Sequence, residues 1–384
     1  MTEHSPLPHK HRHHAPSLHG LGSILRKNAV LCIATLAAIL SCCVVPPDAA
    51  YRDYFDWKTL TCLFCVLAVV CALKNIRFFT ILARKIVECT GSLRRAVLAL
   101  VYITFIGSML IANDMALLTF LPLGYFILSS TGSERHMAFV FILQNIAANL
   151  GGMLTPFGNP QNLYLYTRFA IPTGEFMGIM LFPFLLAILL ITLCCFLLPK
   201  SKITVQADTR RLPVGRTVLY LLLFALSIII VFRFLPYWWG LLIIPSVLFF
   251  ADKKALRAVD YPLLLTFFCF FVFAGNMARI PEIRALFSAV LEKNTLLVST
   301  LSCQVISNVP SAILLSNFTD NYRALLLGVN IGGTGTLIAS LASLITFREY
   351  TLHNPGKAGS YLGRFTLMNV AFLLPLFALC AFLV

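Results

Sequence analysis

The sequence predicts an all-α membrane protein with about nine transmembrane helices and two re-entrant hairpins, arranged in two inverted repeats with broken helices. Three observations support this fold class: the apolar composition, the length of the apolar stretches, and the uneven distribution of basic residues. Of the 384 residues, 59% are hydrophobic and 12% are charged, and the mean hydropathy is +0.86. A chain this apolar has too few polar side chains to cover its own surface, so lipid is the expected solvent.

Seven uninterrupted apolar stretches are candidates for crossing helices. About 20 apolar residues in a helix cross roughly 30 Å of hydrocarbon, and stretches of nearly that length lie at 28–46, 59–74, 174–198, 215–235, 238–251, 261–276 and 364–384. Two further crossings come from interrupted helices at 134–168 and 320–347. Together they give the expected nine.

The lysines and arginines predict the orientation. When the crossings alternate from a cytoplasmic N-terminus, 22 of the 30 basic residues fall on the cytoplasmic side and 8 on the other. This bias is the positive-inside rule, and it predicts an integral protein of the plasma (inner) membrane with its N-terminus in the cytoplasm. The net charge of +15 is thereby explained by topology, and we expect no nucleic-acid partner because no soluble basic patch is interleaved with aromatic residues.

The expected domain organisation follows from these spans. Residues 1–27 hold six of the eight histidines among Pro and Gly and predict a disordered cytoplasmic tail. Whether that tail binds metal stays open. The remaining divisions are the first transmembrane repeat at 28–198, a cytoplasmic linker at 199–214, a connecting transmembrane helix at 215–237, and the second inverted repeat at 238–384.

Two segments break the simple pattern of crossings and predict re-entrant hairpins. In 96–129 two apolar arms are joined only by Asn113 and Asp114, and arms of this length reach roughly 24 Å, short of a full crossing. In 295–318 the second arm is far too short to span. We expect both tips to stop inside the membrane, where non-helical backbone is tolerated only when it is buried in protein or lines a cavity.

A glycine-interrupted helix follows each hairpin, and the features recur in the same order. The pair Gly151-Gly152 with Thr155 matches Gly332-Gly333 with Thr336, and Asn149 matches Asn330. Five crossings separate the matching points, which predicts that the halves are inverted. Inverted repeats with discontinuous helices indicate a transporter site at the membrane midplane.

Asp114 is the acidic residue of greatest interest, because it alone among the acidic residues falls within a long hydrophobic stretch. Burying a carboxylate there costs at least about 2.5–3.5 kcal/mol, so such residues are usually functional. We predict a sodium ligand or a proton carrier. The competing interpretation is an N-cap that satisfies exposed amides.

Carboxamides and broken-helix residues complete the predicted substrate- and ion-binding group. Free N–H groups at half-helix N-termini attract anions and free C=O groups at half-helix C-termini coordinate cations, so one site can hold an anion beside its coupling ion. A sodium ion is expected near Asn113, Asp114 and Asn308. The full group comprises Asn113, Asp114, Asn149, Gly151, Gly152, Thr155, Gly158, Asn159, Gln161, Asn162, Ser307, Asn308, Asn330, Gly332, Gly333, Thr334 and Thr336.

These motifs resemble the ion transporter superfamily, which includes divalent anion/sodium symporters, citrate transporters, arsenite permeases and one class of sodium/proton antiporters. The resemblance covers roughly 50–384 and depends on the motifs DWKTL from Asp56, Asn113-Asp114, TPFGNPQN from Thr155, SNVP from Ser307 and the second Gly-rich break. It implies a homodimer and an elevator-like movement. Carboxylate symporters carry Ser-Asn-Thr at both tips, whereas the Asn-Asp tip here is closer to the arsenite-permease and antiporter branches.

The sequence thus predicts a secondary active transporter and not an enzyme. The expected substrate is a small anion, either a carboxylate such as citrate or a dicarboxylate, or an inorganic oxyanion. No Walker motif is present, so we expect no cofactor beyond Na⁺ or H⁺ as the coupling ion, and no partner beyond substrate, membrane lipid and a second copy. The alternative is a sodium/proton antiporter or an arsenite permease that uses Asp114. The sequence does not choose between these substrates and ions.

Overall fold

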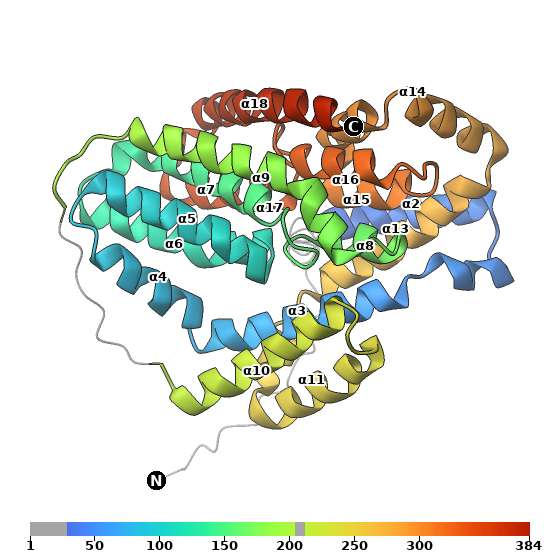
Figure 1. Ribbon diagram of the computed structural model, residues 1–384, viewed down its shortest axis with the longest axis horizontal. Helices are drawn as coiled ribbons and strands as arrows, with labels where there is room; N and C mark the ends of the chain where they lie inside the picture. Colours follow the sequence, from blue (N-terminus) through green and yellow to red (C-terminus); the bar gives the residue numbers. More distant parts are fainter. Residues whose placement is uncertain (1–28, 204–211) are drawn as a thin grey trace, which may run out of the picture.

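The computed structural model describes residues 29–203 and 212–384, and within these ranges the chain is helical (Figure 1). The predicted tail and the middle of the predicted linker lie outside the described residues. The helices are α2 (Ala29–Val44), η1 (Ala49–Tyr54), α3 (Trp57–Asn75), α4 (Phe78–Glu88), α5 (Leu93–Ile111), α6 (Asn113–Ser130), η2 (Glu134–His136), α7 (Met137–Gly151), α8 (Pro160–Arg168), α9 (Thr173–Phe196), α10 (Val214–Val231), α11 (Tyr237–Ala251), α12 (Lys253–Arg257), α13 (Tyr261–Arg279), α14 (Pro281–Ile306), α15 (Asn308–Leu315), α16 (Tyr322–Ile331), α17 (Leu341–His353) and α18 (Ala358–Leu383).

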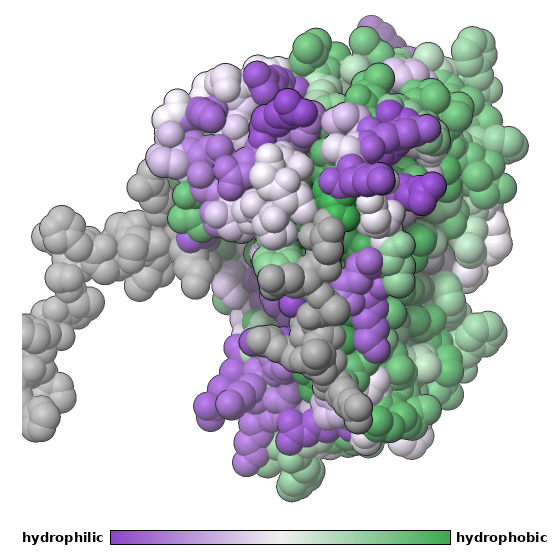
Figure 2. Space-filling view, turned by 90° about the vertical axis from the view of Figure 1, so that its left-hand side faces the viewer, coloured by the Kyte–Doolittle hydropathy of each residue, from purple (hydrophilic) through white to green (hydrophobic). Residues whose placement is uncertain are grey.

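The all-α membrane fold class is confirmed. Six described helices, namely α3, α5, α9, α10, α13 and α18, are long and apolar enough to cross a membrane. Large apolar side chains such as Leu193, Leu222 and Leu367 remain more than half exposed, which suits a lipid environment. Figure 2 shows hydrophilic residues gathered on one end face of the molecule and hydrophobic residues along the adjoining flank. The protein is an integral membrane protein.

The order of elements repeats along the chain. Helices α3 to α9 include a hairpin, α5–α6, and a broken helix, α7–α8; helices α13 to α18 include a hairpin, α14–α15, and a broken helix, α16–α17. The counterpart of α4 is the first part of α14, which is separated from the second part by non-helical backbone at Asn294 (φ −164°, ψ 86°). The repeat of elements is therefore observed, and the opposite orientation of the halves relative to the membrane stays a prediction.

The first helix of each half packs against a helix of the other half. Helix α2 packs along α13, and α11 packs along α3. Hydrogen bonds at the helix ends hold both pairs of helices together. Arg279 at the end of α13 donates to both carboxylate oxygens of Asp48 (3.0 and 2.6 Å) and lowers the pKa of that carboxyl. Asn75 at the end of α3 donates to the Oδ2 of Asp252 (2.9 Å).

Packing separates the helices into two groups (Figure 1). The first group contains α2, α3 and α10–α13, which pack mainly on one another; the second contains α5–α9 and the hairpin and broken helices of α14–α18. Helix α4 joins the groups in the first half and the first part of α14 joins them in the second. We call these the scaffold group and the hairpin group.

The predicted length of the first hairpin arm is wrong. Helix α5 begins at Leu93, after the N-cap position Ser92, and has 19 residues, which corresponds to about 28 Å. The helix therefore includes Arg94 and Arg95, which the hydropathy pattern placed before the start of the hairpin arm. Arg94 is accommodated because its Nε donates to the carbonyl of Leu198 (2.6 Å) at the end of α9. Length alone therefore does not keep this arm from crossing.

Corresponding N-caps open the two halves and provide a stability test. Asp56 Oδ1 accepts from the Thr59 N–H (2.9 Å) at the start of α3, and Asp260 Oδ1 accepts from the Leu263 N–H (3.0 Å) at the start of α13. We expect Asp56→Ala and Asp260→Ala each to lower the free energy of unfolding by about 1 kcal/mol, because a helix loses its cap. Thermal unfolding in detergent should show both shifts, with Asp53→Ala in η1 as the unshifted control. Equal melting temperatures for all three variants would contradict the capping role.

Candidate functional site

Both hairpins reverse at a non-glycine residue in a backbone conformation that only glycine adopts readily. Ala112 has φ 64° and ψ 152°, and Ser307 has φ 75° and ψ 160°. The next residue in each hairpin folds its side chain back on the new helix. Asn113 Oδ1 accepts from the Asp114 N–H (2.9 Å), and Asn308 Oδ1 accepts from the Val309 N–H (2.9 Å). The two tips are therefore built alike, and such strain is concentrated at functional sites.

The two broken helices also share their geometry. Residues 152–159 separate α7 from α8, and residues 332–340 separate α16 from α17. The hydroxyl of Thr155 donates to the Met109 carbonyl (2.8 Å), and the hydroxyl of Thr336 donates to the Gln304 carbonyl (3.0 Å). Each unwound segment is thus fastened to the first arm of its own hairpin, four residues before the tip asparagine.

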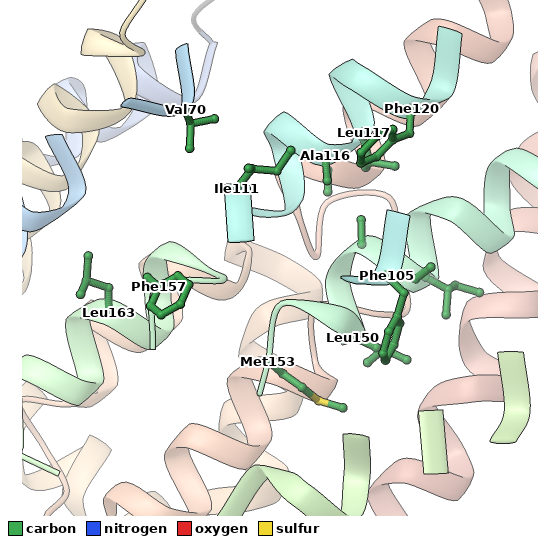
Figure 3. Close-up of a cluster of buried hydrophobic side chains, with 14 of the residues drawn as sticks. Val70, Phe105, Ile111, Ala116, Leu117, Phe120, Leu150, Met153, Phe157 and Leu163 are labelled. Atoms are coloured by element: carbon green, nitrogen blue, oxygen red, sulfur yellow. The ribbon is translucent and has the colours of Figure 1, made fainter. Parts of the chain in front are cut away.

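Close packing holds the end of α7 against the hairpin. A side chain at Gly151 would overlap the carbonyl oxygen of Phe105 and the hydroxyl of Ser108, so the two backbones touch. Figure 3 shows Phe105 of α5 beside Leu150 of α7, with Phe157 in the unwound segment. Small residues at helix contacts allow this close approach in membranes.

Four helix N-termini meet at one cavity of about 320 Å³ between the scaffold and hairpin groups. Helices α6, α8, α15 and α17 begin at its wall, with Asn113, Pro160, Asn308 and the N-cap residue Ser340 in its lining. The opposite wall is apolar and comes from α2 and α13. Because Thr266 and Phe270 in the middle of α13 face both hairpin tips, the tips lie about halfway along a membrane-spanning helix.

An amide network lies behind the cavity and joins the halves. Asn113 Nδ2 donates to Asn149 Oδ1 (3.1 Å) within the first half. Asn330 Nδ2 donates to Asn162 Oδ1 (2.6 Å), and Asn159 Nδ2 lies 3.5 Å from Asn330 Oδ1. All of these side chains are buried. A buried network with its donors used is rigid, so it fixes the two broken helices against each other.

Asp114 is the one acidic residue among the described residues that line the cavity, and no lysine or arginine accompanies it there. The N-cap interpretation is wrong: Ala112 occupies the cap position, and no side-chain cap bond is made. The Asp114 Oδ1 atom is buried and has no hydrogen-bond partner. Since buried carboxylate oxygens are normally bonded, this oxygen is available to a ligand or a proton.

The comparisons with known proteins agree with this arrangement. The family model described as citrate transporter matches residues 21–322. This chain belongs to the citrate transporter family. Two relatives are a protein of Methanocaldococcus jannaschii described as an uncharacterized transporter, 34% identical over 76% of this chain and 81% of its own length, and the inner membrane protein YbiR of Escherichia coli, 30% identical over 76% and 80%. The protein is therefore a membrane transporter.

The predicted residues of this citrate transporter family member divide into two sets. The first set lines the cavity: Asn113, Asp114, Gln161, Ser307 and Asn308. The second set lies behind it, in the amide network, at the helix breaks or in close backbone contacts: Asn149, Gly151, Gly152, Thr155, Gly158, Asn159, Asn162, Asn330, Gly332, Gly333, Thr334 and Thr336. Gly333 lies close to the second tip, since a Cβ placed on it would come within 3.1 Å of the Asn308 amide nitrogen.

The expectation of free carbonyl groups at the half-helix C-termini is wrong for these positions. Asn162 Nδ2 lies 3.1–3.3 Å from the carbonyl oxygens of Gly152, Met153 and Thr155. In the second half, Gln304 Nε2 reaches the carbonyl oxygens of Gly332 (2.8 Å) and Thr334 (3.3 Å). The carboxamides therefore satisfy the broken backbone, whereas the sequence suggested that they face the cavity.

Sequence reasoning missed Gln304, the wall from α2 and α13, and two polar residues of the cavity lining, Thr266 and Ser340. Gln304 also accepts from the Thr336 N–H (2.8 Å), so its side chain makes hydrogen bonds to several backbone groups of the second break. A carboxamide four residues before a hairpin tip, in an otherwise apolar arm, is a signal that could have found it. The wall from α2 and α13 has no such signal, because Val30, Ile33 and Phe273 look like any lipid-facing residues.

Relief of backbone strain tests the tip geometry. Ala112→Gly should stabilise the protein by about 1 kcal/mol, since it removes roughly 1–3 kcal/mol of strain against a glycine entropy cost of about 0.5–1 kcal/mol. Ala112→Val should destabilise it. The matched control Ala116→Gly, inside α6, should also destabilise it. Thermal unfolding in detergent measures all three, and a lower melting temperature for Ala112→Gly would refute the strained tip.

A bulkier residue at the first helix break tests the backbone contact. Gly151→Ala should strongly reduce the yield of monodisperse protein, because the new methyl group overlaps the Phe105 carbonyl. Gly174→Ala, where a Cβ meets no atom within 4 Å, should leave it unchanged. Size-exclusion chromatography after detergent extraction compares the two, and normal yield from Gly151→Ala would show that the contact is not needed.

Proposed function

We propose that this protein is a secondary active transporter that moves a small anion across the membrane. The observation that carries the proposal is the meeting of four helix N-termini at one cavity half-way along a spanning helix. Each N-terminus presents the positive end of a helix dipole. The first-turn N–H groups of α15 are already bonded within the protein, so this helix contributes its dipole and the Asn308 side chain. Such ends bind carboxylates and phosphates without a basic side chain, which suits a lining with no described lysine or arginine.

The substrate is a carboxylate, such as citrate or a dicarboxylate, or an inorganic oxyanion. The amide nitrogens of Asn113 and Asn308 supply donors. The backbone N–H groups of Gln161 in α8 and Leu341 in α17, two residues of the cavity lining, supply the others. The first tip asparagine uses one amide hydrogen on Asn149, which leaves another for a ligand. The family description supports a carboxylate, whereas the Asn-Asp tip supports an oxyanion.

A sodium or proton gradient supplies the energy. Sodium would bind near Asn113, Asp114 and Asn308, whose side-chain oxygens suit a hard cation. In the proton-coupled version Asp114 carries the proton, because its unbonded Oδ1 becomes a donor when protonated. Either ion removes the negative charge of Asp114 from a cavity that must accept an anion.

Movement is of the elevator type, with the hairpin group sliding on the scaffold group in a homodimer. The separation of the helices into these groups supports this proposal, because α4 and the first part of α14 connect them as hinged arms. We place the protein in the plasma (inner) membrane with a cytoplasmic N-terminus, since the basic residues concentrate on that side.

A second candidate function is a sodium/proton antiporter or an arsenite permease that uses Asp114. The buried and unbonded Asp114 Oδ1 atom favours it, because one carboxylate that binds sodium and protons in turn suffices for exchange. Purified protein in liposomes separates the functions. Gradient-driven accumulation of labelled citrate, succinate, sulfate or arsenite identifies the anion transporter, whereas sodium-driven proton movement with no anion requirement identifies the antiporter. Absence of both activities would overturn both functions.

Asp114→Asn tests the coupling role. The amide is isosteric, so we expect a folded protein with gradient-driven flux reduced by at least about a hundredfold, because the side chain can no longer take up a cation or a proton. Asp320→Asn, an exposed change in the α15–α16 turn, is the control and should transport normally. Unchanged, gradient-dependent flux in Asp114→Asn would remove this residue from the mechanism.

A further inference from the structure

A second cavity, of about 470 Å³, lies between α4 and α6. Lys74, Arg77 and Arg84 line it from the end of α3 and from the α4 side, and Leu118 and Phe126 are among the α6 residues opposite. No carboxylate occurs among the described residues of its lining. The Arg84 guanidinium lies over the Phe126 ring, 4.3 Å from its centre, which holds a positive charge against the α6 wall.

Helix α4 shows which side of this cavity faces water. Thr80 and Arg84 lie on its cavity face. Leu82 and Ile86, which are 48% and 45% exposed, lie on roughly the opposite face at helical spacing. An interfacial helix turns its apolar face to lipid and its basic face to water. The cavity therefore lies on the basic side of α4, away from its exposed apolar residues.

The cavity also stands in line with the transport site. Asp114 lines the first cavity, and Leu118 and Pro122, one and two turns later on the same face of α6, line the second. The two cavities therefore lie along one face of α6, although they share no lining residue. The hydrophilic end face in Figure 2 is the side of the molecule at which α4, α5 and α6 reach the surface.

We propose that the second cavity is an anion vestibule, in which Lys74, Arg77 and Arg84 concentrate the substrate anion before it enters the transport cavity. This inference rests on the proposed anion transport. A concave region lined by charge of one sign raises the local concentration of the opposite ion and its association rate by roughly 10–1,000-fold. The two cavities thus differ in charge: the transport cavity has no lysine or arginine in its described lining, and the vestibule has three such residues.

Anionic phospholipid is the other source of an anionic group for this cavity. A lipid headgroup would bring its acyl chains alongside, and basic pockets between membrane helices do bind such headgroups. The orientation of α4 favours dissolved anions, because its exposed apolar residues face away from the cavity. The experiment below separates the two sources.

The reaction rate of an introduced cysteine with charged reagents tests whether the vestibule attracts anions, and this test does not depend on transport. Thr80 lines the cavity, so a T80C variant places a thiol there. We compare its reaction rates with a sulfonate-bearing and a trimethylammonium-bearing methanethiosulfonate, followed by peptide mass spectrometry to separate it from the native cysteines. Relative to N-acetylcysteine amide in solution, the anionic reagent should be favoured at least about tenfold at low salt, and the preference should vanish near 1 M salt.

Matched variants assign the effect to the cavity charges. Adding Arg77→Gln and Arg84→Gln to T80C should bring the preference to within about twofold of the solution value. Lys85→Gln removes the same charge from an exposed position of α4 outside the cavity lining and should leave it unchanged. T119C, on the α6 wall, serves as a second reporter should T80C fold poorly. No anionic preference at either reporter would overturn the vestibule.

A transport assay and a lipid-protection assay complete the test. With a transported anion offered from the α4 side, Arg77→Gln with Arg84→Gln should lower kcat/KM several-fold at low salt and leave kcat unchanged. If no anion is carried but the thiol preference remains, the proposed function fails and the anion site stands. Protection of the T80C thiol by anionic lipid in nanodiscs, with none by sulfate, would instead assign the cavity to a lipid headgroup and overturn the vestibule.

Discussion

The requirement that every backbone polar group be satisfied in lipid governs this structure. Two helices of this membrane protein are interrupted, and each mostly buried unwound segment leaves N–H and C=O groups without helix partners. The protein meets this requirement with carboxamides. Asn162 covers the carbonyl groups of the first break and Gln304 covers those of the second. Some of the polar residues that suggest a ligand site in the sequence are therefore needed to satisfy the backbone of the unwound segments.

The two breaks differ in where the covering carboxamide comes from. Asn162 belongs to the helix after the break, whereas Gln304 belongs to the hairpin arm before it. The tips differ too, since Asp114 in the first half corresponds to Val309 in the second. The two hairpin tips therefore share nearly the same backbone structure, but only the first tip carries a titratable carboxyl group, that of Asp114. In the proposed mechanism this asymmetry lets one cavity couple an anion to a cation, because only the first tip carries a carboxylate.

Close backbone contacts make the frame rigid around this cavity. Gly151 touches the first hairpin arm, and Gly332 lies against Cys303 in the second. These contacts hold the hairpins and the broken helices together around the four helix N-termini. This rigidity is what the proposed elevator movement requires, and the largely apolar lining from α2 and α13 suits the sliding contact in that proposal.

The sequence by itself determined the membrane class and the pairing of the two halves, while its count of nine crossings stays a prediction beside the six described helices that are long enough to span. Apolar length and the spacing of Asn113, Asn308 and the glycine pairs are local properties of the chain, and lipid enforces them strongly. It also named five of the seven polar residues in the described cavity lining, because a polar group in lipid is costly and therefore conspicuous. It did not name Thr266 or Ser340.

Only the tertiary structure decided which amides face the ligand and which face backbone. Asn149, Asn159, Asn162 and Asn330 have the same chemistry as Asn113, and their roles depend on helices that come together from distant parts of the chain. The same holds for the apolar wall and for the basic cavity beside α4, whose residues look unremarkable in sequence. Hydropathy and spacing report on single helices, whereas a site between helices is a property of their packing.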